Sequence, residues 1–474
     1  MRRTKIVATL GPGSSSSEVI LEMIRAGVDV FRLNFSHGSH EEQKHRVDVI
    51  RECSESSGRI VGILADLQGP KIRTHKFKDG IVQLIRGETF ILDAALGKNE
   101  GTQERVGLAY KDLPKDVKAG DILLLDDGRV ELEVNEVVGD EVRCIVVYTC
   151  ELSNNKGINL KGGGLSAPAL TDKDKEDLKA AVAMEVDFMA LSFARTAEDV
   201  NQCRALVKAA GSDASIVTKV ERAEAIDNID EIIEASDVIM VARGDLGVEM
   251  GDAELPALQK SLIKAARGKN KVVITATQMM ESMIDSPIPT RAEVFDVANA
   301  VLDGTDAVML SGETAVGKYP AKTVEAMGRI CEHAEKQRAA MVSDHRLDLV
   351  FGRVDEAIAM AAMYTANHLE MNAIASLTES GATVLWMSRI SSGIPIYALT
   401  PRRDTSRKVT MYRGVYPISV DFDKLGPYHV TDSVVDLMKD KGIIVSGDSI
   451  VVTRGDMLGD QSGGSNTMKI VQVS

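Results

Sequence analysis

Two short apolar runs in the sequence end in charged residues whose types could do chemistry. The first run ends at Lys219 and Glu221, and the second ends at Arg243, Gly244 and Asp245. Continuous Val/Ile runs are typical of buried parallel strands, so charge at their carboxyl ends indicates either a solvated edge of ion pairs or an active site. Two carboxylates and a lysine at the ends of successive strands suit a divalent metal ion beside a phosphate or a carboxylate.

These runs belong to a series of eight, and helix-like stretches lie between most of them. Residues 17–26, 173–184 and 254–267 are such stretches. Strand alternating with helix eight times predicts a (β/α)8 barrel, with an open doubly wound sheet as the rival. The eight expected strands span residues 5–10, 28–35, 60–66, 187–193, 216–221, 237–245, 271–277 and 306–311.

The barrel pattern is interrupted once and is followed by a second α/β pattern. The long interval after the third strand contains short alternating runs and a hairpin-type turn at residues 126–128. We expect an all-β lid domain at residues 69–162, inserted into a catalytic barrel at residues 1–68 and 163–336. A C-terminal α/β domain is expected at residues 345–474.

Polar and charged side chains stand at the carboxyl end of nearly every expected strand. Because the strands of a barrel converge at that face, these side chains should share one mouth although the sequence scatters them. If these residues were only solvated surface groups, that would have to be true independently at each strand. Single members such as His37 or Ser192 nevertheless suit a structural role equally well. The set is Arg32, Asn34, Ser36, His37, Asp66, Lys71, Arg73, Ser192, Phe193, Lys219, Glu221, Gly244, Asp245, Thr277, Ser311 and Glu313.

Composition restricts the class of protein. A chain of 474 residues predicts two or three domains, and a net charge of −14 argues against a general binder of nucleic acid or anionic membranes. The five cysteines are scattered, so reduced thiols are expected rather than disulfides or metal ligands. No signal-like stretch or run of roughly 18 apolar residues occurs, which indicates a cytoplasmic protein.

One local motif indicates a different kind of phosphate-binding site. Residues 312–318 follow a strand and match the start of a phosphate-binding P-loop, but the next residue is Tyr319 where the metal-ligating Ser or Thr would stand. A loop that starts a helix is the preferred interpretation.

Four longer strings give the chain a family resemblance. It resembles pyruvate kinase in RLNFSHG at 32–38, MVARGDLGVE at 240–249, ITATQMMESMI at 274–284 and the segment at 289–320, and the likeness covers nearly the whole chain. It is most similar to the bacterial branch whose effectors are AMP and sugar monophosphates. The resemblance implies transfer of the phosphoryl group of phosphoenolpyruvate to ADP, the final step of glycolysis, in a homotetramer.

The resemblance also implies roles for single residues. Glu221 and Asp245 would hold Mg²⁺ or Mn²⁺, Lys219 would neutralise charge on the transferring phosphoryl group, and Thr277 would position the proton source. Gly244 and Asp245, at the amino end of a short helix, would offer N–H groups to the substrate carboxylate. The substrate-binding set would be Arg32, Lys219, Gly244, Asp245 and Thr277, with Arg32 and Arg73 clamping phosphates, and the nucleotide set Asn34, His37, Arg73 and Lys156.

The chain departs from the family at the monovalent-cation site. Potassium-dependent members read Asp-Thr-Lys-Gly-Pro-Glu, whereas residues 66–71 here read Asp-Leu-Gln-Gly-Pro-Lys. Asn34, Ser36, Asp66 and Leu67 would remain as ligands of K⁺, but the ammonium of Lys71 adds positive charge there. Potassium is therefore a possible cofactor that we do not expect to be required.

An effector site is expected in the C-terminal domain. Residues 378–383 join a strand to a helix, and Thr378, Ser380, Gly381 and Thr383 would form a phosphate-binding nest. Ordinary helix capping is the alternative.

Two other functions compete with the kinase: a metal-dependent lyase for 2-oxo acids on a related barrel, and a catalytically silent effector-binding regulator.

Overall fold

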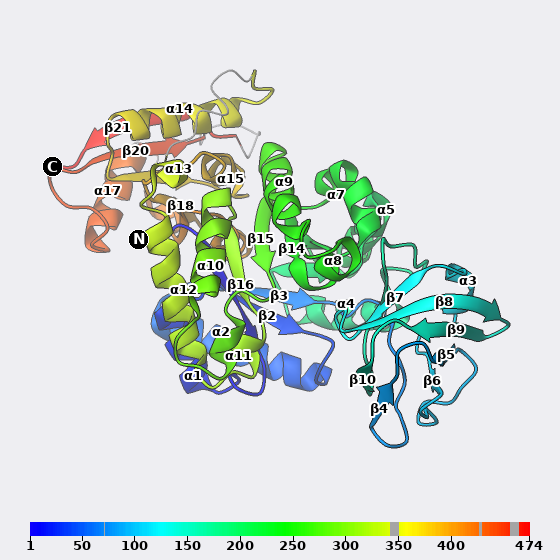
Figure 1. Ribbon diagram of the computed structural model, residues 1–474. Coiled ribbons are helices and arrows are strands. Elements are labelled where there is room, and N and C mark those ends of the chain that lie inside the picture. Colours follow the sequence, from blue (N-terminus) through cyan, green and yellow to red (C-terminus); the bar gives the residue numbers. More distant parts are fainter. Residues whose placement is uncertain (71, 342–349, 426–428, 456–463) are drawn as a thin grey trace. The chain divides into compact units, whose positions relative to one another are not determined.

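The computed structural model describes residues 1–70, 72–341, 350–425, 429–455 and 464–474. Eight strands close a barrel in the order β1-β16-β15-β14-β13-β12-β3-β2, which confirms the predicted barrel over the open sheet (Figure 1). The chain divides into two compact units. One unit is formed by Met1–Ala65, Ala183–Met189 and Ile263–Ser474, and the other by Asp66–Val182 and Ala190–Leu262.

The barrel strands are short and almost wholly buried, as continuous apolar runs predict. Neighbouring strands pair in parallel, for example β1 with β2 and with β16. The expected run at 237–245 ends as a strand at Ala242, because helix α8 (Arg243–Met250) begins at the next residue. The strands are β1 (Lys5–Leu10), β2 (Val30–Asn34), β3 (Gly62–Asp66), β12 (Phe188–Leu191), β13 (Ser215–Val220), β14 (Val238–Ala242), β15 (Val272–Ala276) and β16 (Ala307–Leu310).

Local capping fixes where several barrel helices begin. Ser39 and Glu42 form a capping box before α2, and Thr290 and Glu293 form one before α10. The P-loop-like segment is confirmed as a helix start, since it leads through α11 into α12. The helices are α1 (Ser17–Ala26), α2 (His40–Ser57), α4 (Asp172–Ala183), α5 (Ala197–Ala209), α6 (Ala223–Asp227), α7 (Ile229–Ala235), α8, α9 (Leu255–Gly268), η1 (Glu281–Ile284), α10 (Arg291–Asp303), α11 (Gly312–Ala315), α12 (Pro320–Ala334) and α13 (Arg338–Met341).

The insertion after β3 is a β domain with its own core. Its six-stranded sheet has the order β11-β7-β8-β9-β5-β6, and β4 pairs with β10 in a second sheet. The predicted turn at 126–128 joins antiparallel β7 and β8, with positive φ at Asp126, Asp127 and Gly128. The elements are β4 (Ile81–Leu84), β5 (Thr89–Asp93), β6 (Arg105–Gly107), α3 (Leu113–Asp116), β7 (Ile122–Leu125), β8 (Val130–Val138), β9 (Glu141–Val146), β10 (Cys150–Ser153) and β11 (Ile158–Leu160).

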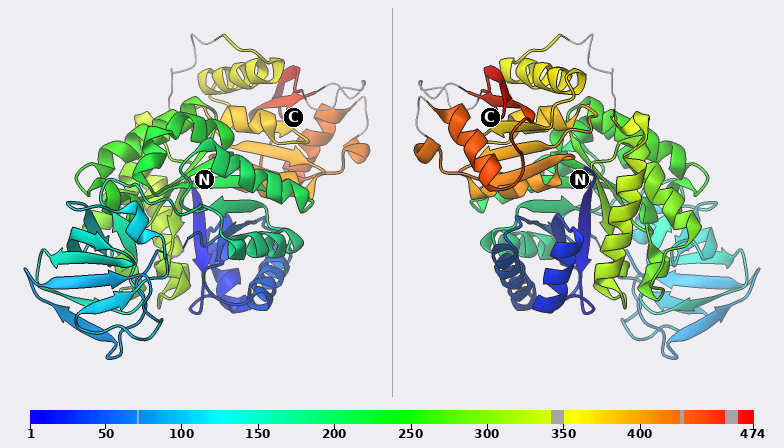
Figure 2. Two further views of the ribbon diagram at one scale, coloured as in Figure 1. Left: turned by 90° about the vertical axis from the view of Figure 1, so that its right-hand side faces the viewer. Right: turned by 90° about the vertical axis from the view of Figure 1, so that its left-hand side faces the viewer.

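The C-terminal domain is a five-stranded sheet in the order β19-β18-β17-β20-β21, with only β21 antiparallel. Helices α14 (yellow) and α17 (orange) cover opposite faces of this sheet (Figure 2). The elements are α14 (Val354–His368), β17 (Ala373–Leu377), α15 (Ala382–Ser388), β18 (Ile396–Thr400), α16 (Arg403–Lys408), η2 (Val409–Met411), β19 (Val415–Ser419), η3 (Phe422–Leu425), α17 (Val430–Asp440), β20 (Ser449–Arg454) and β21 (Thr467–Gln472).

The cysteines and the helix lengths bear on two expectations from composition. All five cysteines are free thiols, as their scattered positions predict. Across the described ranges, no helix combines the length and the apolar character needed to cross a membrane.

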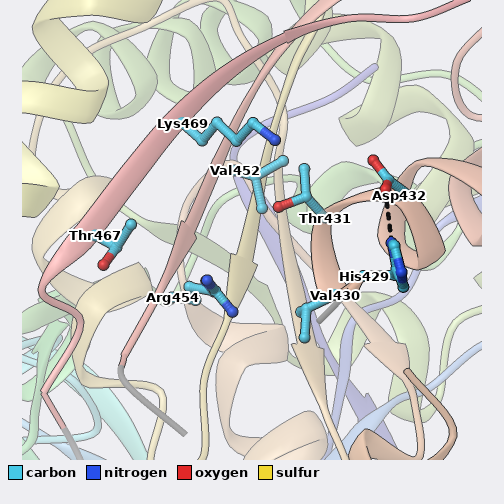
Figure 3. A pocket seen from close by; sticks show the side chains of 8 residues that line it. All are labelled: His429, Val430, Thr431, Asp432, Val452, Arg454, Thr467 and Lys469. Carbon is cyan, nitrogen blue, oxygen red and sulfur yellow. Dashed lines mark hydrogen bonds and ion pairs between the residues drawn. The ribbon is translucent and has the colours of Figure 1, made fainter. Parts of the chain in front are cut away.

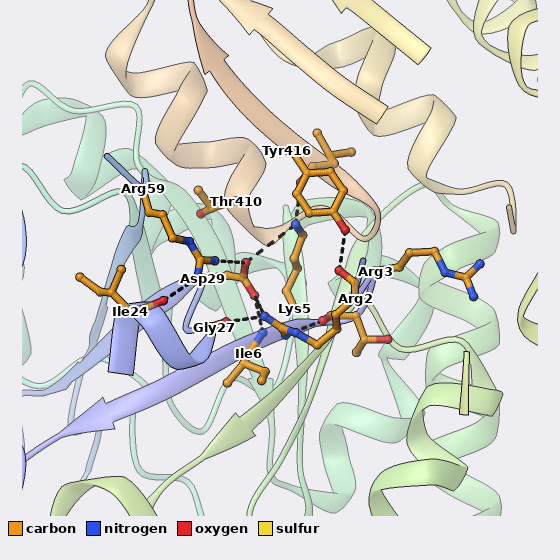
Figure 4. Close-up of polar contacts among 12 residues, drawn as sticks. Arg2, Arg3, Lys5, Ile6, Ile24, Gly27, Asp29, Arg59, Thr410 and Tyr416 are labelled. Carbon is orange, nitrogen blue, oxygen red and sulfur yellow. Dashed lines mark hydrogen bonds and ion pairs between the residues drawn. The ribbon is translucent and has the colours of Figure 1, made fainter. Parts of the chain in front are cut away.

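A buried ionic cluster joins the barrel to the C-terminal domain (Figure 4). The carboxylate of Asp29 accepts from Arg2 Nη2 at 2.8 Å and lies 3.9 Å from Lys5 Nζ. Lys5 Nζ donates to the carbonyl of Val415 at 2.6 Å and lies 4.4 Å from the ring centre of Tyr416, whose hydroxyl donates to the carbonyl of Arg2 at 2.6 Å. Strand β19 is thus held against the start of β1 by both charge and hydrogen bonds.

A second buried ion pair acts at the same junction. Arg389 is fully buried and donates through both terminal nitrogens to the carboxylate of Asp306, with Nη1 at 2.9 Å. Helix α15 ends at Ser388. The chain leaves the helix there and the Arg389 side chain reaches the barrel.

Replacing Lys5 should change how stability depends on pH. Burial lowers the pKa of Lys5 to about 8 from its ordinary value of 10.5, with Asp29 opposing the shift. Between these two values the unfolded chain binds more protons at this residue than the folded chain, so the lysine's contribution to the free energy of unfolding rises with pH. We expect Lys5→Met to remove that rise, measured as the thermal midpoint of wild type and variant from pH 7 to pH 10.

The exposed Lys44 provides the matched control, since Lys44→Met should leave the wild-type pH dependence in place. Parallel curves for wild type and Lys5→Met would contradict the prediction.

Candidate active site

Lys219 is the centre of a buried polar cluster at the end of β13. Its ammonium lies 2.8 Å from Glu221 Oε1 and 3.5 Å from Asp66 Oδ1, and it donates to Ser192 Oγ at 2.8 Å. Only 13% of the side chain is exposed. Three barrel strands, β3, β12 and β13, bring these groups together, as the strand-end hypothesis predicts for this part of the set.

Glu221 and Asp245 supply two carboxylates to the same region. Glu221 is 3% exposed, and its Oε2 accepts from the backbone N–H of Phe193 at 3.0 Å. Burial and the charge of Glu221 raise the pKa of Asp245 to about 6, while Lys219 and Arg73 oppose the rise. A buried and a partly buried carboxylate that disfavour each other's ionisation are a donor set that a hard divalent cation would stabilise.

The two carboxylates would not enclose a metal ion by themselves. In the part of the chain that the structure describes, no group of three or more His, Cys, Asp or Glu side chains could hold an ion.

Ser192 has a structural contact and a functional one. Its hydroxyl donates to the carbonyl of Leu67 at 2.7 Å and accepts from Lys219. Phe193, the next residue, has a φ of 55°, a left-handed conformation that is uncommon for a bulky residue. This strained turn aims the Phe193 N–H at Glu221, so the end of β12 positions both the lysine and the first carboxylate.

The lid carries two of the cations expected to contact phosphates. The backbone of Arg73 forms an isolated β-bridge with Gly157 at the base of the lid. Lys156, the neighbour of Gly157, pairs with Asp126 of the β7–β8 turn at 2.7 Å. Arg73 lies on the segment that enters the lid and Lys156 on the segment that leaves it. The bridge therefore brings the two residues close together although they are far apart in sequence.

The remaining catalytic candidates belong to the other unit. Arg32 Nη1 donates to Thr9 Oγ1 at 3.1 Å, and Asn34 Oδ1 accepts from the N–H of Ser36 at 3.0 Å. Thr277 has a φ of 67°, a strained value for a β-branched residue and one often found at functional sites. That these residues and His37 meet Lys219 in one mouth stays a prediction, and Lys71 lies outside the described residues.

The expected effector loop is well ordered by its own hydrogen bonds. Thr378 Oγ1 accepts from the N–H of Gly381 at 2.9 Å, and Gly381 has a φ of 81°. Ser380 Oγ accepts from the N–H of Ala382 at 3.4 Å, and Thr383 Oγ1 lies 2.8 Å from Ser465 Oγ. These contacts order the turn before α15, whose N-cap Gly381 has no side-chain cap hydrogen bond, and a phosphate-binding role for the loop stays a prediction.

The same domain has a polar cavity that sequence reasoning missed. It has a volume of about 150 Å³ and lies between the start of α17 and strands β20 and β21 (Figure 3). Arg454 and Lys469 bring positive charge to it, and His429 Nδ1 lies 3.4 Å from Asp432 Oδ2 at its rim. Only pairing of β20 with β21 places Arg454 opposite Thr467, so no spacing in the sequence could have indicated the cavity.

Glu249 is another residue that sequence reasoning did not single out. It lies on α8 one helical turn after Asp245, is 6% exposed, and accepts from the N–H of Ala223 at 2.9 Å. Its spacing of four residues from Asp245 on one helix was the available signal.

Comparison with known proteins gives a consistent result over the whole chain. A family model described as the barrel domain of pyruvate kinase matches residues 1–324, and one described as its alpha/beta domain matches residues 356–471. The chain is 56% identical to pyruvate kinase II of Salmonella typhimurium over 100% of its length and 99% of the relative. It is 53% identical to a pyruvate kinase of Haemophilus influenzae over 96% of both chains.

A solved structure agrees with this result. The crystal structure of a pyruvate kinase from Cryptosporidium parvum superposes with a TM-score of 0.91 at 35% identity, covering 100% of this chain and 96% of that one.

Proposed function

The chain belongs to the pyruvate kinase family and transfers the phosphoryl group of phosphoenolpyruvate to ADP, and we propose how its residues divide that work. The observation that carries the proposal is the Lys219 cluster, in which one buried ammonium faces the carboxylates of Glu221 and Asp66. Phosphoryl transfer needs positioning and charge neutralisation more than covalent help from the protein.

In this proposal Glu221 and Asp245 hold a divalent metal ion, Mg²⁺ or Mn²⁺. When bound, the ion would supply positive charge to the phosphoryl and carboxylate oxygens of the substrate. Lys219 would neutralise charge on the phosphoryl group during transfer, held in place by Ser192. The first-turn N–H groups of α8 at Gly244 and Asp245 would receive the substrate carboxylate.

The other roles rest on the family likeness. Arg32 and Arg73 would clamp phosphates, Asn34, His37, Arg73 and Lys156 would contact the nucleotide, and Thr277 would position the proton that converts enolpyruvate to pyruvate. A lyase acting on 2-oxo acids would have no phosphoryl group for Lys219 to neutralise. The glycolytic reaction supports a cytoplasmic location.

Replacing Lys219 tests the assignment most directly. Loss of a preorganised positive charge from the transition state should lower kcat of Lys219→Met by on the order of 10²–10³ or more, with a smaller effect on substrate binding. Pyruvate release from phosphoenolpyruvate and ADP can be followed with lactate dehydrogenase and NADH. The exposed Lys208 on α5 gives a control, Lys208→Met, that should keep wild-type kcat. A Lys219→Met enzyme with near wild-type turnover would refute the role.

We also propose that potassium is not required. In the sequence, Lys71 follows Asp66 and Leu67 at the position where potassium-dependent members have a glutamate. A tethered ammonium avoids the entropic cost of recruiting a free cation, and its charge disfavours a second one.

We expect substantial activity in buffers whose only monovalent cation is tetramethylammonium, and potassium dependence in Lys71→Glu. Activity of both enzymes is measured with and without KCl at constant ionic strength. If wild type is nearly inactive without potassium and is restored many-fold by it, Lys71 is not a substitute cation and the site at Asn34, Ser36, Asp66 and Leu67 works as in potassium-dependent members.

The proposed effector is a phosphate ester, AMP or a sugar monophosphate, bound at Thr378, Ser380, Gly381 and Thr383 of a homotetramer. The cationic cavity with Arg454 and Lys469 in the same domain supports an anionic ligand. Such an ester should lower KM for phosphoenolpyruvate, and Ser380→Asp should mimic or block the effect through its charge.

A panel of AMP and sugar monophosphates in the coupled assay checks this, with the exposed Ser446→Asp as a charge-matched control in the same domain. If no ester shifts a kinetic parameter, the loop is a helix cap. Sedimentation velocity tests the tetramer separately.

A further inference from the structure

The lid returns to the barrel through a segment held against α8. After β11 ends at Leu160, Gly162, Gly163 and Gly164 all have positive φ, of 84°, 82° and 114°, so a sharp turn follows the lid's last strand. The N–H of Gly162 donates to the carbonyl of Glu249 at 3.1 Å. A run of three such glycines gives the connection freedom, and its contacts with α8 restrict that freedom.

The side chain of Glu249 makes one contact with the lid and one with the barrel. Its Oε1 accepts from Asn159 Nδ2, on β11, at 3.3 Å. Its Oε2 accepts from the N–H of Ala223 at 2.9 Å, two residues after Glu221. The helix that carries Glu249 also carries Asp245, so one buried carboxylate links the lid's last strand to both proposed metal-binding segments.

Both partners of the Glu249 carboxylate are hydrogen-bond donors. A carboxylate can accept from both. A glutamine could keep both contacts, because its oxygen can accept from the N–H of Ala223 while its own amide N–H donates to Oδ1 of a turned Asn159 amide. A leucine has no polar side-chain atom and therefore removes both contacts. Burial raises the pKa of Glu249 to about 7, opposed by these two hydrogen bonds, and the nearby charge of Glu224 adds to the rise while Arg222 reduces it. The chain thus keeps an acid at a place where burial disfavours its charged form.

We propose that Glu249 is a positioning residue that fixes the orientation of the lid relative to Glu221 and Asp245, and thereby sets the affinity and reactivity of bound nucleotide. Lys156 stands three residues before Asn159 on the same lid segment, so a change in that segment's tilt moves a proposed nucleotide-binding cation. Misplacing a positioning element by about 1 Å can cost as much as 10²-fold in rate. The inference rests on the proposed roles of Glu221, Asp245 and Lys156.

A double-mutant cycle isolates the contact. We expect Glu249→Leu and Asn159→Ala each to lower kcat/KM for ADP by about tenfold or more, the effect of losing a hydrogen bond to a charged group. KM for phosphoenolpyruvate should change by less than about twofold. Because Glu249→Leu already removes the contact that Asn159→Ala removes, the double variant should be no worse than Glu249→Leu alone. Amide hydrogen exchange in residues 158–164 should rise in all three.

Asn154→Ala provides the matched control. Asn154 is a lid asparagine whose Oδ1 accepts from the N–H of Phe77 at 2.7 Å within the lid itself. Its effect on kcat/KM should multiply with that of Glu249→Leu, because the two sites share no partner. General damage to the lid would instead make Asn159→Ala and Asn154→Ala behave alike in combination with Glu249→Leu.

Two outcomes would overturn the proposal: wild-type kcat/KM for ADP in Glu249→Leu, or effects of Glu249→Leu and Asn159→Ala that multiply. If Glu249→Leu does not fold, Asn159→Ala decides alone through its ratio of ADP to phosphoenolpyruvate effects and its hydrogen exchange. The metal-binding roles are tested separately. A Glu221→Gln enzyme that keeps the wild-type activation constant for Mg²⁺ would refute them.

Discussion

The balance of charge around Lys219 is the constraint on which the active-site region depends. Asp66 and Glu221 are almost completely removed from water and Asp245 is partly buried, beside one ammonium and the charge of Arg73. Burying that much negative charge costs free energy unless cations compensate it. Burial and the charge of Glu221 raise the pKa of Asp245 against the opposing charges of Lys219 and Arg73, in keeping with the metal-binding role proposed for this residue.

The architecture explains how such a cluster can be maintained. Asp66, Ser192 and Lys219 each stand at the end of a buried barrel strand whose backbone is fixed by its neighbours, so their side chains lose little further freedom on meeting. A left-handed backbone conformation occurs directly after β12 at Phe193, where the turn directs an N–H to Glu221.

The C-terminal domain is attached by a different principle. Its contacts with the barrel include Arg389 with Asp306, which are both buried, and the cluster of Lys5, Asp29 and Tyr416, in which Tyr416 is half-buried. Removing one partner of a buried ion pair is strongly destabilising, because the other charge is left buried without compensation. The intact pair specifies a geometry more than it adds stability. A domain expected to bind an effector is thereby joined to β1 through directional contacts that have few alternative arrangements.

The sequence by itself determined the barrel, the inserted β domain, the C-terminal α/β domain and the identity of the family. Buried strands need continuous apolar runs, helices need caps such as Ser39 with Glu42, and hairpins need residues that accept positive φ, so these features are written locally. It also named Lys219, Glu221 and Asp245, because charge at the end of an apolar run is conspicuous. Only the tertiary structure decided that Ser192 contacts Lys219, that Arg454 and Lys469 line a cavity, and that Glu249 joins Asn159 to Ala223. Each of these depends on segments distant in the chain that are brought together by strand pairing and helix packing, and no local pattern encodes which distant donor a buried acceptor will meet.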